Sequence, residues 1–156
     1  VAVCPVINPA NAMIAMEQGI RFYERYFERK WSRSLKIKKQ AFPDLYGAET
    51  WHEIKGLRER THYLATRHAG FQSAEEYFEG YSIADGRLAP LAVPSTLLTS
   101  ADDPVVPVGD FKDLPDNPKL ELIVTEHGGH CGFLKNWKLE SMAEDLIADR
   151  FLSAAP

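Results

Sequence analysis

Apolar residues of this chain lie in three short runs separated by longer polar or helical stretches. The first run, Val1-Ala-Val-Cys-Pro-Val-Ile7, is almost continuously apolar, which is typical of a parallel strand buried on both faces. Asn8 and Pro9 follow it and predict a helix start, because asparagine caps free backbone amides and proline is tolerated at the first helical position. Two further runs, over residues 94–101 and 119–125, predict two more strands.

Between the first and second runs, the spacing of apolar residues changes to that of helices. Four of them recur every three or four positions, which predicts an amphipathic helix. These residues are Ile20, Tyr23, Phe27 and Trp31. We expect a second helix over about residues 49–67, and a capping box at Ser73–Glu76 predicts a third. Apolar positions from Leu139 to Phe151 predict the last helix.

The order strand, helical region, strand, strand, helix predicts an α/β fold with parallel strands flanked by helices. With 156 residues, the chain has the length of one domain, and residues 20–82 form a helical, cap-like insert within it. No apolar run approaches the roughly 18 residues that a membrane-spanning helix needs.

Charge is unevenly distributed along the chain. The net charge is −4, which argues against a nucleic-acid partner. Eight of the eighteen basic residues nevertheless lie between Arg21 and Lys39, with only Glu24 and Glu28 as acidic residues there. This segment carries +6 and the remainder −10. Such a segment is either a solvated helix face or a contact with an anionic membrane surface or a phosphate-rich partner.

Two cysteines, Cys4 and Cys131, are too few for a disulfide scaffold and indicate a reducing, cytoplasmic location. The chain begins with Val1 and shows no signal peptide. We therefore expect it to be part of a longer protein.

Ionisable residues follow two of the predicted strands. Asp102 and Asp103 come after the strand at 94–101, and His130 comes after the strand at 119–125. The carboxyl ends of parallel strands meet at one edge of a sheet, so a carboxylate there would fix the tautomer of an imidazole. The alternative is an aspartate that caps a turn and a histidine exposed in a loop.

The other candidate catalytic or metal-binding residues are supported less well by the sequence. Ser82 lies in a Gly-x-Ser-x-Ala match, but a predicted helix precedes it, which favours an ordinary loop serine. Cys131 is adjacent to His130, and we expect its side chain to point away and pack. No metal is expected. His52, His62 and His68 lie in predicted helical segments without acidic or cysteine partners at metal-ligand spacing. His127 and His130 are three positions apart, but the two glycines between them disfavour a helical ligand pair.

Several segments resemble the YheT-like branch of the α/β-hydrolase superfamily, which includes bacterial esterases and ABHD1/ABHD3-type acyl hydrolases. The most specific is Thr125-Glu-His-Gly-Gly-His-Cys-Gly-Phe133, and Ser100-Ala-Asp-Asp-Pro-Val-Val-Pro107 resembles the acid loop of the superfamily. The resemblance extends over residues 1–156 and implies the C-terminal portion of an α/β-hydrolase domain.

This resemblance also implies the roles of two residues. The family order is nucleophilic serine, then aspartate, then histidine. Asp103 would orient His130, which acts as general base and then general acid. Asp102 is the neighbouring candidate, and Asp103 is preferred because the acid of the superfamily usually directly precedes a short apolar-proline stretch, here Pro104–Pro107. The Gly-x-Ser-x-Gly nucleophile elbow is absent, so the serine is expected in a missing N-terminal part and this chain alone is expected to be inactive.

The predicted function is hydrolysis of a small-molecule or lipid-like carboxylic ester, without a cofactor. The alternative is a non-catalytic α/β-hydrolase-like domain used for binding or assembly, because some superfamily members have lost their chemistry. A parallel sheet cut next to Val1 has an unpaired apolar edge, so the isolated chain is expected to be oligomeric or paired with its missing half.

Overall fold

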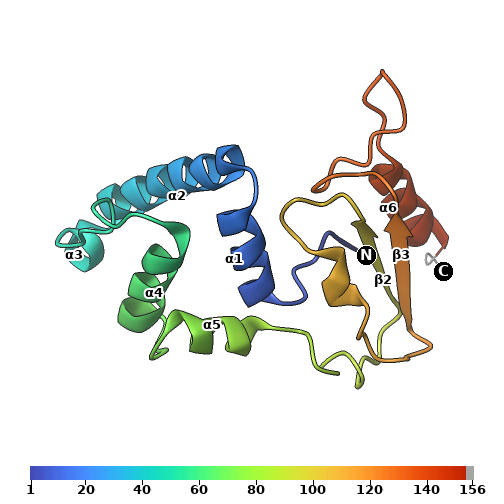
Figure 1. Cartoon of the computed structure of the whole chain (residues 1–156), viewed down its shortest axis with the longest axis horizontal. Coiled ribbons are helices and arrows are strands. Elements are labelled where there is room, and N and C mark those ends of the chain that lie inside the picture. Colours follow the sequence, from blue (N-terminus) through green and yellow to red (C-terminus); the bar gives the residue numbers. More distant parts are fainter. Residues whose placement is uncertain (154–156) are drawn as a thin grey trace. The chain divides into compact units, whose positions relative to one another are not determined.

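A computed structural model describes residues 1–153 and divides the chain into two compact units (Figure 1). The first unit contains residues 1–12 and the described residues from Ser82 onward, and the second contains Met13–Tyr81. The elements are β1 (Ala2–Val3), α1 (Pro9–Gln18), α2 (Arg21–Ala41), α3 (Pro43–Tyr46), α4 (Leu57–His68), α5 (Ala74–Tyr81), β2 (Ser95–Ser100), the 3-10 helix η1 (Val108–Phe111), β3 (Leu120–Thr125) and α6 (Met142–Ser153).

The first unit is built on a three-stranded parallel sheet in the order β1-β2-β3. Val3 pairs with Leu98, and Leu98 pairs with Ile123, so these three side chains share one face. That face packs against α6, which lies beside the sheet in Figure 1. The buried centre of this contact comprises Cys4, Leu98, Phe133 and Ala143. The predicted α/β class with parallel strands is therefore confirmed.

The first strand is much shorter than its apolar run predicts. Pairing ends at Val3, because Cys4 adopts a positive φ of 45° and Pro5 has no amide hydrogen to donate. Val1 and Val6 are 44% and 40% exposed. The prediction of a strand over residues 1–7 buried on both faces is therefore wrong beyond Val3, although Ile7 is fully buried.

The other two strands lie where their apolar runs predict them. β2 is the central strand, and its last five residues are buried. β3 is an edge strand whose Leu122 and Val124 are 38% and 47% exposed. Because Leu122 and Val124 alternate with Ile123, they lie on the face of the sheet opposite α6.

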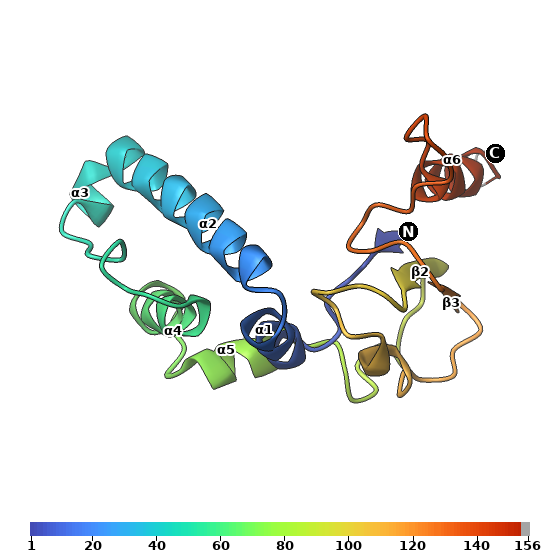
Figure 2. The ribbon, with the colours of Figure 1, turned by 45° about the horizontal axis from the view of Figure 1, so that its top comes forward.

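The second unit is entirely helical, and α2 is its longest helix (Figure 2). Leu35 is buried, while Tyr23, Phe27 and Trp31 are half-buried, as the predicted amphipathic stripe requires. Ile20 does not belong to this stripe, because it precedes the helix and is 64% exposed. No helix within residues 1–153 has the length and apolar character needed to cross a membrane.

The second predicted helix begins later than its sequence pattern suggests. α4 starts at Leu57 because Gly56, at φ 84°, changes the chain direction, and its amide donates a hydrogen bond of 2.8 Å to the Glu28 carboxylate. Asn8 caps α1 as predicted, with its Oδ1 accepting the amides of Ala10 and Asn11 at 3.0 and 3.3 Å.

A buried carboxylate holds the segment before α4. Glu49 accepts hydrogen bonds from the Tyr63 hydroxyl at 2.6 Å and Arg67 Nε at 3.0 Å, and His68 Nε2 lies 3.3 Å away. Burial alone would raise the pKa of Glu49, but these hydrogen bonds and the nearby positive charges lower it overall. His68 therefore has a structural acidic partner that local sequence spacing does not reveal.

Candidate active site

The structure brings Asp103 and His130 together at the carboxyl ends of β2 and β3. Asp103 Oδ2 lies 3.0 Å from His130 Nδ1, within hydrogen-bonding distance. The Asp103 side chain is fully buried, and that of His130 is 30% exposed. A fixed acid thus contacts an imidazole that solvent reaches, which is the arrangement expected when a carboxylate orients a catalytic base.

Backbone amides fix the Asp103 carboxylate. Its Oδ1 accepts the amide hydrogens of Val105 at 2.8 Å and Val106 at 3.0 Å. The other oxygen is thereby presented to His130. Because an ionised carboxylate is only an acceptor, Nδ1 of His130 carries the hydrogen in this contact, and Nε2 of the neutral ring is left as an acceptor.

Asp102 has a different structural task. Its Oδ1 accepts the amides of Gly128 at 2.9 Å and Gly129 at 2.8 Å, and its Oδ2 lies 3.6 Å from His127 Nδ1. The Gly129 amide is the main cause that lowers the pKa of Asp102 below its usual value. Of the two adjacent aspartates, Asp103 contacts the His130 ring, while Asp102 holds the glycine turn that leads to it.

The turn itself requires glycine. A Cβ atom on Gly128 would lie 2.7 Å from the ring of Phe133 and 3.0 Å from Cβ of Ser100. Gly129 adopts a φ of 55°, and its carbonyl accepts a hydrogen bond of 2.9 Å from the Ser100 hydroxyl. Close packing against β2 therefore sets the path that carries His130 over the sheet edge.

Both cysteines lie beside His130, and sequence reasoning missed the contribution of Cys4. Cys4 Sγ, Cys131 Sγ and a ring nitrogen of His130 lie within 4.8 Å of one another. Cys131 is exposed, so the expectation that it packs away from His130 is wrong. Burial raises the pKa of Cys4 to about 12. No local signal reveals that Cys4 joins His130 and Cys131, because Cys4 and Cys131 are 127 positions apart and meet only when β1 joins the sheet.

Ser82 occupies a structural position. It follows α5 rather than a strand, it is buried, and its hydroxyl donates a 3.3 Å hydrogen bond to the carbonyl of Ile7. The strand–serine–helix turn of a nucleophile elbow is therefore not formed here, and Ser82 is the ordinary loop serine that its sequence context favours.

The sequence of this chain is similar to those of several known proteins, including three that have phospholipase or esterase names. Phospholipase ABHD3 of Homo sapiens is 29% identical over 105 residues, which are 65% of this chain and 25% of that protein. "Putative esterase YheT" of Escherichia coli (strain K12) is 30% identical over 126 residues, covering 76% of this chain and 36% of that protein. Medium-chain fatty acid ethyl ester synthase/esterase 2 of Saccharomyces cerevisiae is 30% identical over 96 residues, covering 58% of this chain and 21% of that protein.

No family model matches the chain, and no solved structure matches it. The parallel sheet with flanking helices and these relatives together define part of an α/β-hydrolase fold. Within that class, the chain belongs to the YheT- and ABHD-like family of α/β hydrolases. It spans between 21% and 36% of the length of the three relatives described above.

Proposed function

We propose that this protein is a serine hydrolase of carboxylic esters in which Asp103 orients His130. The observation that carries the proposal is the 3.0 Å contact between the fully buried Asp103 carboxylate and His130 Nδ1, at adjacent strand ends. The phospholipase and esterase names of the relatives support a hydrolase in general.

The proposed reaction is acyl transfer followed by hydrolysis. His130 Nε2 accepts the serine proton as the serine oxygen bonds to the ester carbonyl carbon, and Asp103 stabilises the resulting imidazolium. The imidazolium then protonates the departing alcohol as the carbon–oxygen bond breaks. Finally, His130 accepts a proton from the water that attacks the acyl-serine. It returns this proton to the serine oxygen as the acyl–oxygen bond breaks, which releases the carboxylic acid and restores the enzyme.

We place the nucleophilic serine N-terminal to Val1, in a Gly-x-Ser-x-Gly turn that follows a strand. β1 is an edge strand of the described sheet, so a further parallel strand carrying that turn would pair beside it. Finding glycine or alanine at that serine position in the full-length protein would favour the binding-domain alternative.

Labelling by a serine-directed fluorophosphonate tests the proposal. In the full-length protein, we expect His130→Ala to slow labelling roughly 10²–10⁴-fold, because the serine loses its general base. The rate is measured by gel fluorescence over time. The matched control is His127→Ala, which removes a neighbouring, more exposed histidine and should label at the unsubstituted rate. Equal labelling of both variants would contradict the proposed role of His130.

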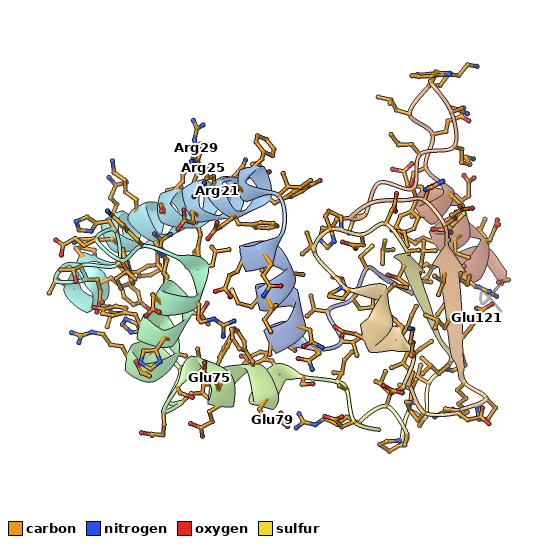
Figure 3. All side chains as sticks on the ribbon, viewed as in Figure 1. Arg21, Arg25, Arg29, Glu75, Glu79 and Glu121 are labelled. Carbon is orange, nitrogen blue, oxygen red and sulfur yellow. The ribbon has the colours of Figure 1, made fainter. Side chains whose placement is uncertain are left out.

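We also propose that α2 contacts an anionic membrane surface, where lipid-like esters reside. Arg21, Arg25 and Arg29 follow one another along this helix (Figure 3), and none forms an ion pair with a residue described by the structure. Phe22 and Tyr26, next to them, are 70% and 48% exposed. Arginines beside exposed aromatic side chains are typical of helices that lie on membranes.

Vesicle binding tests this contact. Exchanging Arg21, Arg25 and Arg29 for glutamine should reduce binding to phosphatidylserine-containing vesicles roughly 100-fold, since each surface cation contributes about 1 kcal/mol. Binding is measured by co-sedimentation, and phosphatidylcholine vesicles serve as the uncharged comparison. The matched control removes the same charge from the first unit by exchanging Lys112, Lys119 and Lys138 for glutamine. An equal loss in both triple variants would contradict a specific role of α2.

A further inference from the structure

We propose that Cys4, His130 and Cys131 form a binding site for a thiophilic divalent cation of the Zn²⁺ class, and that the bound cation inhibits the enzyme. The cation would occupy the imidazole that ester hydrolysis requires. The inhibition rests on the proposed function, whereas the cation binding does not.

The first argument is the chemistry of the donor set. Two cysteine sulfurs and one histidine nitrogen are ligands that Zn²⁺ prefers, and a Cys₂His set leaves a fourth position for water. The three ligand atoms come from two distant parts of the chain, the end of β1 and the loop after β3, and lie within 4.8 Å of one another. Such a set is far more selective for zinc than a lone cysteine or a group of surface carboxylates.

The second argument is distance. Zinc–sulfur bonds of about 2.3 Å and zinc–nitrogen bonds of about 2.0 Å place tetrahedral ligand atoms about 3.6–3.8 Å apart. The observed limit of 4.8 Å requires the ligand atoms to close by at most about 1.2 Å. Side-chain rotations of Cys131 and His130 supply such a movement without displacing the sheet, because both residues are exposed and lie in the loop after β3.

The third argument is the surroundings of His130. Histidines that bind metals nearly always have their other ring nitrogen hydrogen-bonded to a carboxylate or carbonyl group, which orients the ring and increases its basicity. Asp103 Oδ2 provides this contact to Nδ1 at 3.0 Å, and the carboxylate is itself held by two backbone amides, so the cation would bind His130 through Nε2. The pair that prepares an imidazole to accept a proton thus also prepares it to bind a metal ion.

The position of Cys4 adds a fixed anchor to the site. Its sulfur accepts a 3.4 Å hydrogen bond from the Cys131 amide, and its own amide donates a 2.7 Å hydrogen bond to the carbonyl of Leu98. The buried sulfur is thereby tied to the central strand, while His130 and Cys131 remain accessible to solvent. A cation would reach the site from the exposed side and release protons from the thiols as it binds.

Cobalt spectroscopy and zinc inhibition test the proposal in the full-length protein, with both cysteines kept reduced by a phosphine. We expect Co²⁺ to produce sulfur-to-metal charge-transfer absorption, which Zn²⁺ abolishes by displacement. Zn²⁺ should inhibit ester hydrolysis, and a chelator should restore the rate. Cys131→Ser, an exposed and therefore structurally mild substitution, should weaken Zn²⁺ affinity at least roughly 100-fold while the metal-free enzyme still hydrolyses ester.

The matched control is His127→Asn, which removes an exposed histidine in the same loop but outside the three ligands and should leave the zinc affinity unchanged. Absence of the charge-transfer band, or the same zinc affinity in Cys131→Ser and the unsubstituted protein, would overturn the cation site. A band that Cys131→Ser removes, in a protein that hydrolyses no ester, would support the site and refute the proposed function instead. Normal ester hydrolysis without a charge-transfer band would support the proposed function and refute the cation site.

Discussion

Asp103→Asn will lower kcat for ester hydrolysis by about 10⁴-fold in the full-length protein, with little change in KM. The oxygen of the introduced asparagine still accepts the amides of Val105 and Val106, so its side-chain amide nitrogen faces His130 in place of Oδ2. An amide N–H donates to Nδ1 and places the imidazole proton on Nε2, where the serine proton must be accepted. Steady-state kinetics with a soluble chromogenic ester measures the effect.

The control for this experiment is the neighbouring residue. Asp102→Asn makes the same chemical change one position earlier, and its oxygen still accepts the amides of Gly128 and Gly129. The loss of one charged acceptor weakens the turn only modestly, so kcat should fall less than about fivefold. Comparable losses for both variants would refute the assignment of Asp103, and a large loss for Asp102→Asn alone would reverse it.

Gly128→Ala is expected to impair both stability and catalysis. The added methyl group would lie 2.7 Å from the ring of Phe133, which is 3% exposed and belongs to the core between the sheet and α6. Overpacking of a closed core of this kind lowers the free energy of unfolding by about 1–3 kcal/mol. Movement of the turn also displaces His130, and misplacing a catalytic group by about 1 Å lowers the rate about 100-fold.

Urea denaturation followed by circular dichroism measures the stability change, and ester kinetics measures the catalytic one. Gly109→Ala is the matched control, because a Cβ there meets no atom within 4 Å and its backbone does not have a positive φ. This control should be as stable and as active as the unsubstituted protein. Retention of full stability and rate by Gly128→Ala would show that the turn tolerates a side chain and does not set the position of His130.

Local patterns predict most elements of this fold because each depends on neighbouring residues. The strands β2 and β3, the cap of α1 by Asn8 and the cap of α5 by Ser73 all lie where the sequence indicates. Glu76 completes the predicted capping box one residue early, because its carboxylate accepts the amide of Gln72 instead of that of Ser73. The first strand is predicted too long because apolar composition indicates burial but not backbone conformation. The positive φ of Cys4 arises where the chain leaves the sheet and turns toward α1.

The order of elements likewise predicts one part of the candidate site, whereas another part depends on the direction of individual side chains. Topology predicts that groups following two parallel strands meet at one sheet edge, so proximity of an aspartate and His130 follows from the order of elements. The choice between Asp102 and Asp103 depends on the hydrogen bonds that each carboxylate accepts. The amides of Val105 and Val106 hold one carboxylate, and those of Gly128 and Gly129 hold the other. Those are differences in side-chain direction between adjacent residues, which periodicity does not describe.

By itself, the sequence determined the α/β class, the resemblance to α/β hydrolases and the two loops that carry the candidate chemistry, because these depend on composition and on the order of runs. The tertiary structure alone decided that Asp103 contacts His130, that Asp102 supports the turn, and that Cys4 lies beside Cys131. The physical reason is that hydrogen bonds and ligand sets act over a few ångströms in space. Strand pairing brings together atoms that are up to 127 positions apart along the chain.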